Sequence, residues 1–309
     1  MILAGDIGGT KTTLALFDDG AVKRDVTVKS GDHGSLEEII EAMKPGTVTA
    51  ACFGVAGPVV DGVSKITNLP WTIAASSLEK LVGAPVTLIN DLQATAYGML
   101  VIDKFAVLQD GPRPERATIA VVAPGTGFGE SLLFHDGKRY HALASEGGHA
   151  DFAPTSDEEV ELLKFLRAKY GEHVSIERVL SGAGIGDLYD FCRGDQPALP
   201  YDGDRNAAIG KAGCECTEPY AQRAIEMFVR ILGSEAGNHA LRGLTIGGVV
   251  IGGGIPPKIL PALQRGTLVE RFAAKGRFHD WARALSVRVA LEPRAALYGA
   301  AHQASRNHG

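Results

Sequence analysis

Short apolar segments alternate with glycine-rich turns in the first part of the chain. Residues 2–4 and 12–17 flank the turn at 5–11, which predicts two strands joined by a tight bend. Residues 118–122 and 131–134 flank a second glycine turn, at 125–129, in the same way. The chain therefore presents one motif twice, a strand, a glycine turn containing a Thr and a second strand. Internal duplication and coincidence both explain this repeat.

Apolar periodicity predicts the other elements. Leu36, Ile39, Ile40 and Met43 recur at helical spacing within residues 29–45. Apolar runs predict strands at 48–55, 86–89 and within 247–255, where the last run ends in three glycines; helices are predicted at 92–100, 158–170, 220–241 and 294–303. Because strands and helices interleave, and helices dominate after residue 156, the sequence predicts an α/β fold.

Length and composition extend this prediction. A chain of 309 residues exceeds what one small core usually holds, so two domains are expected. Hydrophobic residues make up 45% of the chain and charged residues 22%, which is enough to bury a large core. There are 39 glycines, whereas average usage predicts roughly 22. The glycines of the motifs described below are about as numerous as this excess, which suggests that the extra glycines serve binding loops.

Charge and cysteine content exclude several classes of protein. The net charge is −5 and no run of Lys or Arg occurs, which argues against a nucleic-acid or anionic-membrane partner. No apolar run approaches the roughly 20 residues that span a bilayer, and the first residues lack the basic region of a signal peptide. Cys214 and Cys216 are too closely spaced for a zinc knuckle. We expect a cytoplasmic protein with reduced thiols and no structural zinc.

The two glycine turns have the composition of phosphate-binding loops. Glycine lets backbone N–H groups approach a phosphate, because no Cβ blocks them. Lys11 precedes a strand, so the first turn is not a Walker A loop, and no G-x-G-x-x-G opens a helix. Tight hairpins without a ligand are the alternative. Asp6, at a strand end beside Gly8, Gly9 and Thr10, favours a magnesium ion held partly through water.

Three further places carry polar residues of possible chemical use. Asn90 and Asp91 follow a buried strand, where ligands bind in α/β proteins, although Asp91 could instead be the N-cap of the next helix. The glycines between Glu146 and His149 disfavour a helix and predict a loop that binds hydroxyl groups without a metal, or else a surface turn. Glu177 could equally be a first-turn carboxylate of its own helix.

Together these segments resemble the bacterial ATP-dependent glucokinases of the hexokinase type, in the superfamily that includes actin and the heat-shock ATPases. Eight motifs occur in family order across nearly the whole chain. They lie at residues 6–11, 54–59, 67–71, 88–91, 125–129, 146–154, 175–182 and 251–255.

The resemblance implies a two-domain, actin-like (ribonuclease H-like) fold with the active site between the domains. Residues 1–101 with 293–309 would form the small domain, and residues 102–292 the large one. Asp91 would be the base that takes the proton from the 6-hydroxyl of glucose. The sugar would also contact Asn90, Glu146, His149 and Glu177. ATP would bind through a first phosphate loop (Asp6, Gly8, Gly9, Thr10, Lys11), a second one (Gly125, Thr126, Gly127) and an adenosine loop (Gly252, Gly253, Gly254).

The resemblance also implies Mg²⁺, held through water by Asp6, and a homodimer as the assembly. Two departures from the family pattern stand in the second loop, where Ala123 and Pro124 open the turn and Phe128 replaces Leu. Pro124 removes a backbone donor, so we expect an altered nucleotide affinity. No Cys lies between His149 and Tyr170, unlike in the zinc-containing sugar kinases.

Three alternatives compete with a glucose kinase. A kinase for fructose, mannose or an N-acetyl sugar would use the same motifs. A sugar-sensing regulator would carry a DNA-binding segment ahead of the phosphate loop, for which Asp6 leaves no space. An actin-like filament protein is disfavoured by the sugar loop of Glu146 and His149.

Overall fold

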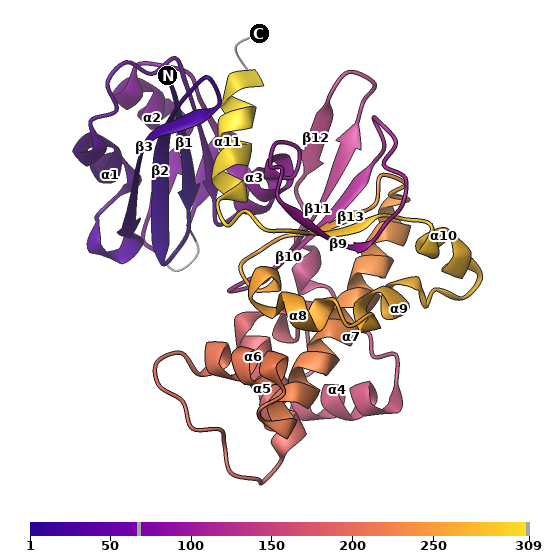
Figure 1. The fold of residues 1–309 in the computed structure, drawn as a ribbon. Helices are drawn as coiled ribbons and strands as arrows, with labels where there is room; N and C mark the ends of the chain where they lie inside the picture. Colours follow the sequence, from indigo (N-terminus) through magenta and orange to yellow (C-terminus); the bar gives the residue numbers. More distant parts are fainter. Residues whose placement is uncertain (67–68, 307–309) are drawn as a thin grey trace. The chain divides into compact units, whose positions relative to one another are not determined.

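The computed structural model describes residues 1–66 and 69–306, and it divides into two compact units (Figure 1). Unit 1 comprises residues 1–103, 141–144 and the C-terminal segment from Arg294. Unit 2 comprises residues 104–140 and 145–293. The first two residues of the motif at 67–71 lie outside the described residues.

Unit 1 is built on a five-stranded sheet with the order β3-β2-β1-β4-β8. Its strands are β1 (Ile2–Ile7), β2 (Lys11–Asp18), β3 (Ala21–Lys29), β4 (Ala50–Val55) and β8 (Val86–Asn90). Strands β1, β4 and β8 are parallel, whereas β1, β2 and β3 form an antiparallel meander. The glycine turn at 8–10 joins β1 to β2, as predicted.

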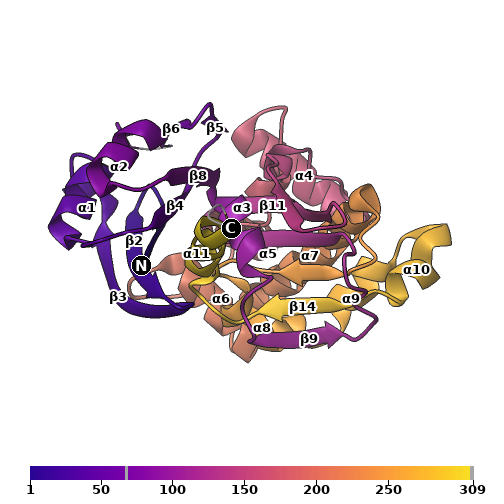
Figure 2. The same cartoon turned by 90° about the horizontal axis from the view of Figure 1, so that it is seen from above.

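Helices cover both faces of this sheet (Figure 2). They are α1 (Leu36–Met43), α2 (Ala75–Val82), α3 (Asp91–Gly98) and α11 (Ala295–Arg306). Large side chains such as Leu3, Ile7 and Phe53 form a core with α1 and α2. The opposite face carries small residues, because successive side chains of a strand alternate between faces. There α3 and α11 approach closely, and a Cβ on Gly54 would meet the Cβ of Ala94.

Shorter elements complete unit 1. A small sheet with the order β5-β6-β7 follows β4 in the chain. Its strands are β5 (Val59–Val60), β6 (Val63–Lys65) and β7 (Thr72–Ala74), and a 3₁₀ turn, η1 (Ser30–Asp32), follows β3.

The sheet of unit 2 repeats the strand pattern of unit 1. Its order is β12-β11-β10-β13-β14-β9, with β10 antiparallel to β11 and parallel to β13, which in turn is parallel to β14. The strands are β9 (Phe105–Gln109), β10 (Ile119–Pro124), β11 (Phe128–His135), β12 (Tyr140–Leu143), β13 (Val249–Ile251) and β14 (Val287–Ala290). Thus β10, β11, β13 and β14 correspond to β1, β2, β4 and β8. The shared topology favours duplication over coincidence.

Helices make up most of the rest of unit 2. They are α4 (Asp157–Tyr170), α5 (Gly182–Arg193), α6 (Arg205–Glu215), α7 (Pro219–Gly243), α8 (Leu260–Leu263), α9 (Thr267–Ala273) and α10 (His279–Arg283). Four 3₁₀ turns are η2 (Gly147–His149), η3 (Ile176–Arg178), η4 (Pro256–Ile259) and η5 (Gly276–Phe278). Helix α7 has buried residues along most of its length, from Ala221 to Ala240.

The predicted α/β class and the predicted helices are therefore confirmed, with boundaries shifted by a few residues. The sequence does not predict the remaining helices α2, α5, α6, α8, α9 and α10 or the strands β3, β5, β6, β7, β9, β12 and β14. Their apolar positions are short or interrupted by Gly and charged residues. Within the described part of the chain, no helix combines the length and apolar character needed to cross a membrane.

Helix α11 depends on Gly299 for its contact with α3. A Cβ at Gly299 would overlap the carbonyl oxygen of Ala94, and a Cβ at Gly98 would overlap that of Ala295. We expect Gly299→Ala to lower the free energy of unfolding by about 1–3 kcal/mol, since overpacking against backbone forces the helices apart. Urea denaturation followed by far-UV circular dichroism measures this change.

The matched control is Gly210→Ala in α6, where a Cβ would enter open space. That variant should gain up to about 1 kcal/mol from helix propensity. Equal midpoints for Gly299→Ala and the wild type would show that the two helices do not depend on this close approach.

Candidate active site

The first glycine loop of unit 1 is held in shape by Ser30. The N–H of Gly8 donates to the carbonyl oxygen of Lys11 at 3.0 Å. Ser30 is fully buried; its N–H donates to the Thr10 carbonyl at 3.0 Å and its hydroxyl to the Gly8 carbonyl at 2.7 Å. Thr12 Oγ1 shares a further hydrogen bond of 2.9 Å with Ser30 Oγ. Sequence reasoning missed Ser30, because it lies well away in the chain from the loop and belongs to no motif.

Asp6 stands at the carboxyl end of β1, next to this loop. Burial raises the pKa of its carboxyl group, and the positive charge of Lys11 opposes the shift. Among the described residues, no hydrogen bond or ion pair to the Asp6 carboxylate is found. A partly desolvated carboxylate without a protein partner suits a magnesium ion, which is commonly bound by one or two carboxylates together with water and substrate phosphates. In the same described ranges, no cluster of three or more His, Cys, Asp or Glu side chains could hold a metal.

Asn90 and Asp91 occupy the same edge of the sheet as Asp6. The register pairs Ile7 with Val55, and Val55 with Asn90, so the carboxyl ends of β1 and β8 flank that of β4. With strands roughly 4.8 Å apart, the ends of β1 and β8 are separated by about 10 Å.

The alternative reading of Asp91 as the N-cap of α3 is wrong, because Asn90 is the N-cap. Asn90 Oδ1 accepts a hydrogen bond from Leu92 N at 2.8 Å, and Gln93 Oε1 accepts one from Asn90 N at 3.1 Å, which forms a capping box. Asn90 Nδ2 donates to the Gly57 carbonyl at 3.2 Å. Asp91 is the first helical residue, half-buried, and its Oδ1 accepts from Leu92 N at 2.8 Å.

The second glycine loop, in unit 2, is joined to the start of α5. The N–H of Gly125 donates to the Gly127 carbonyl at 2.8 Å, and the Gly182 N–H donates to the Gly125 carbonyl at 2.9 Å. Gly182 is the first residue of α5, whose N-cap is Ser181. A helix N-terminus favours negative charge, so this junction is suited to a phosphate.

The backbone of Phe128 brings the predicted sugar-binding residues of unit 2 to this loop. Its N–H donates to Glu177 Oε2 at 2.9 Å. Its carbonyl oxygen lies where a Cβ on Gly148 would be, so the turn η2 packs directly on the strand. The Ile176 N–H donates to the Ala150 carbonyl at 2.8 Å and ties the same turn to η3. Glu177 belongs to the first turn of the short helix η3, which agrees with the interpretation as a first-turn carboxylate. Its carboxylate also accepts the hydrogen bond from Phe128 N, 49 residues away in the chain.

Glu146 and His149 flank η2 with exposed side chains. Residues 147–149 form a short 3₁₀ turn, so the segment contains no α-helix, as the glycines predict. Glu146 Oε2 and His149 Nε2 lie 3.8 Å apart, with exposed side-chain fractions of 67% and 63%. Both polar groups are thus accessible to a ligand.

The third glycine run leaves β13 beside the second loop. Gly252 N donates to the Val122 carbonyl at 2.8 Å and Ile255 N to the Pro124 carbonyl at 3.2 Å. Gly253 has φ +84°, and a Cβ there would also overlap the Pro124 carbonyl. Only Gly254 of this run lines the adjacent cavity.

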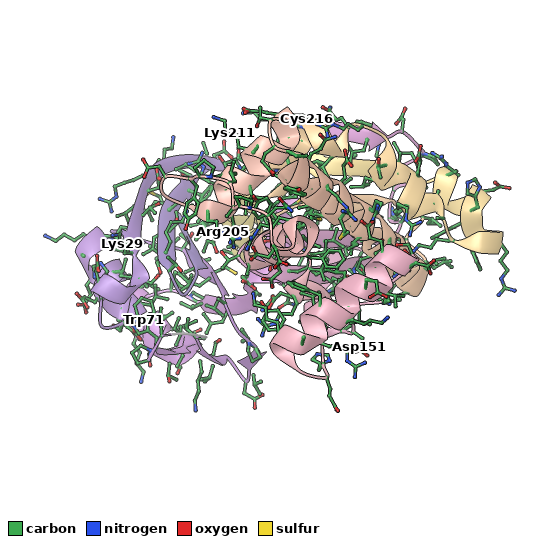
Figure 3. All side chains as sticks on the ribbon, turned by 90° about the horizontal axis from the view of Figure 1, so that it is seen from below. Lys29, Trp71, Asp151, Arg205, Lys211 and Cys216 are labelled. Carbon is green, nitrogen blue, oxygen red and sulfur yellow. The ribbon has the colours of Figure 1, made fainter. Side chains whose placement is uncertain are left out.

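That cavity has a volume of about 550 Å³ and is formed entirely by unit 2. Gly125 and Thr126 of the second loop lie at its wall. One face of α6 supplies much of the remaining lining: Asn206, Ala207, Gly210, Lys211, Cys214 and Glu215. Figure 3 labels Arg205 and Lys211 of this helix, and Cys216, which follows its last residue. Sequence reasoning missed α6 altogether, since its alternation of Gly, Ala and polar residues gives little apolar periodicity.

Glycine loops on two sheets that share one strand pattern, each in its own compact unit, are the features of the two-domain actin-like class. Within that class, the chain belongs to the glucokinase family, whose sequence profile matches residues 3–307.

Individual relatives support the assignment to this family. Over 99% of both chains, the sequence is 36% identical to the glucokinase of Trichormus variabilis. The crystal structure of a glucokinase from an Antarctic psychrotroph superposes with a TM-score of 0.85 at 32% identity, covering 99% of this chain and 98% of that one. Glucokinase from Balamuthia mandrillaris in complex with glucose shares the fold with a TM-score of 0.84 at 22% identity, covering 98% and 93% of the two chains.

We expect Glu177→Ala to lower the free energy of unfolding by about 1–3 kcal/mol, because it leaves the Phe128 N–H without its acceptor. Glu177→Gln should recover part of this loss, since its amide oxygen can still accept. Chemical denaturation measures both values.

Glu172→Ala serves as the control, because Glu172 is an exposed side chain in the same segment and should change stability by no more than about 0.5 kcal/mol. If Glu177→Ala matched that control, the bond to Phe128 would contribute nothing to holding the loop.

Proposed function

We propose that this chain transfers the γ-phosphoryl group of ATP to the 6-hydroxyl of D-glucose. The observation that carries the proposal is the register of β1, β4 and β8, which puts Asp91 and the first glycine loop at one edge of unit 1. A carboxylate base beside a phosphate site is the minimum that phosphoryl transfer to a hydroxyl requires. The similarity to glucokinases over nearly the full length supports glucose as the acceptor.

Each unit has its own part in the proposed reaction. Unit 1, with boundaries expected near residues 101 and 293, supplies the first phosphate loop and the base. Unit 2 supplies the second phosphate loop (Gly125, Thr126, Gly127), the sugar-binding turn and the adenosine loop (Gly252, Gly253, Gly254). The cavity beside Gly125 and Gly254 supports adenosine binding there.

In the first loop, Gly9, Thr10 and Lys11 bind phosphate oxygens through backbone N–H groups and one ammonium group. Gly8, whose own N–H donates to the Lys11 carbonyl, shapes the turn around them. Asp6 holds Mg²⁺ through water, and its unpartnered carboxylate supports this role. The ion, when bound, neutralises charge on the phosphates.

Asp91 accepts the proton of the 6-hydroxyl as that oxygen forms its bond to the γ-phosphorus and ADP leaves. The Leu92 N–H orients the carboxylate by donating to Oδ1. Asn90 donates the second hydrogen of its amide group to the sugar. Its first amide hydrogen binds the Gly57 carbonyl, and its amide oxygen accepts from Leu92 N as the N-cap of α3. Glu146, His149 and Glu177 bind the remaining hydroxyls of the sugar.

A kinase for another hexose is the second candidate, since the exposed Glu146 and His149 could bind hydroxyls of several sugars. An activity panel with glucose, fructose, mannose and N-acetylglucosamine distinguishes the two. A homodimer in the cytoplasm is the proposed physiological form, and analytical ultracentrifugation tests its assembly.

Asp91→Asn should lower kcat for glucose by about 10²–10⁴-fold, because the amide cannot accept the proton in the transition state. The KM for glucose should change little. Steady-state kinetics by coupled ADP release measure both constants.

Asp25→Asn, which alters an exposed carboxylate on β3, should retain the wild-type kcat. A wild-type kcat in Asp91→Asn would contradict the assignment of Asp91 as the catalytic base.

Gly210→Leu should raise the KM for ATP at least about tenfold, a loss of about 1.4 kcal/mol in binding. The reason is that a side chain at this position enters open space at the wall of the cavity. The KM for glucose should stay within about twofold.

Gly210→Ala, a smaller change at the same position, should affect the KM for ATP less. An unchanged KM for ATP in Gly210→Leu would place the nucleotide elsewhere.

A further inference from the structure

A buried carboxyl group lies directly beneath the sugar-binding turn, and the proposed reaction does not use it. Glu130 is on β11, two residues after Phe128, and only 2% of it is exposed. A Cβ on Gly147 would overlap Glu130 Oε2, so the carboxyl group is in direct contact with the turn between Glu146 and His149.

Helix α7 supplies the groups that face Glu130. His239 Nδ1 lies 3.4 Å and Arg242 Nη1 3.7 Å from Glu130 Oε2. Glu235, also buried, lies beside Glu130 and binds Arg242 at 2.6 Å. Glu130 Oε1 has no hydrogen-bond partner among the described residues.

More distant charges complete these surroundings. Burial lowers the pKa of Lys275 to about 8, and the negative charge of Glu235 opposes this shift. Lys275 Nζ donates to the Ser234 carbonyl at 2.8 Å. Other titratable side chains on elements next to β11 are Tyr140 and His141 on β12, Glu146 and His149 around η2, and Glu177 on η3.

The tautomer of His239 shows which form of Glu130 fits this site. His239 Nε2 lies 2.9 Å from the carbonyl oxygen of Ser131, and only an N–H can make that bond. Burial lowers the pKa of His239, so its ring is neutral and Nδ1 carries a lone pair. His239 Nδ1 lies 3.4 Å from Glu130 Oε2. A protonated Glu130 can donate to it, whereas a carboxylate would meet a second acceptor.

The carboxyl group is also unusually hard to ionise. Burial, followed by the like charge of Glu235, raises the pKa of Glu130 to about 8, while Arg242 opposes the shift. Because the pKa in the folded state is raised, the neutral form is present below about pH 8 and is lost as the pH rises through that value.

We propose that Glu130 is a positioning residue whose neutral carboxyl group supports the 146–149 turn in its sugar-binding conformation, and whose ionisation loosens that turn. An ionised Glu130 adds a negative charge beside Glu235 and the His239 lone pair, and the half-exposed Arg242 offsets it only in part. The carboxylate then attracts water, and the contact with Gly147 opens. The consequence for glucose affinity rests on the proposed function.

The kinetic test compares the wild type with Glu130→Gln between about pH 6.5 and about pH 9.5. Glutamine has nearly the same shape and stays neutral, and its amide N–H can donate to His239. At neutral pH the two proteins should have the same KM for glucose within about twofold. Above about pH 8 the KM of the wild type should rise several-fold relative to that of Glu130→Gln, with kcat little changed, because uniform binding is lost. An equal pH dependence of the two KM values would overturn the proposal.

A second measurement does not depend on activity. Amide hydrogen exchange of the peptide covering residues 145–152 is compared for the two proteins at each pH, so that the intrinsic pH dependence cancels. The ratio of the exchange rates should be near one at neutral pH and should rise several-fold above about pH 8. A constant ratio would refute the role of Glu130, even if glucose were phosphorylated. Absence of any sugar phosphorylation, with a rising ratio, would refute the proposed function alone.

Discussion

The two backbone contacts of Phe128 hold together the candidate binding elements of unit 2. The N–H binds Glu177 and the carbonyl oxygen abuts Gly148. Through these contacts the second phosphate loop, the turn η2 and the turn η3 take positions set by one strand end. The side chain of Phe128 is buried in the core of the unit. The positions of the proposed sugar-binding side chains therefore depend on core packing. A substitution in the core behind β11 would shift these side chains.

The parts of the fold that the sequence predicts are those encoded locally. The glycine hairpins, the strand before Asn90 and the helices α4, α7 and α11 follow from apolar runs and turn residues that are close together in the chain. Ser30, which holds the first loop, and α6, which lines the cavity, carry no such local pattern. Their roles arise from contacts between distant segments, which periodicity does not encode.

The two units differ in chemistry on a shared strand pattern. The equivalent of Asp6 at the end of β1 is Ala123 near the end of β10. At this position of the shared strand pattern, unit 1 has a carboxylate and unit 2 has a methyl group. In unit 2, polar groups come from the turns η2 and η3, which lie in the long connection between β12 and α7.

The size of the glycine excess suggests that the extra glycines belong to binding loops. The structure shows that some of them instead serve contacts between helices. Gly98 and Gly299 let two helices of unit 1 approach each other, and Gly213 lets α6 pack against the Ala221 carbonyl in α7. Other glycines outside the motifs stand where a Cβ would meet backbone, as Gly233 does beside Leu268. Glycine therefore serves two physical needs in this chain, the approach of backbone to ligand and the approach of helix to helix. A count cannot separate these needs, because both favour the residue without a Cβ, and only the neighbours of each glycine in the fold distinguish them.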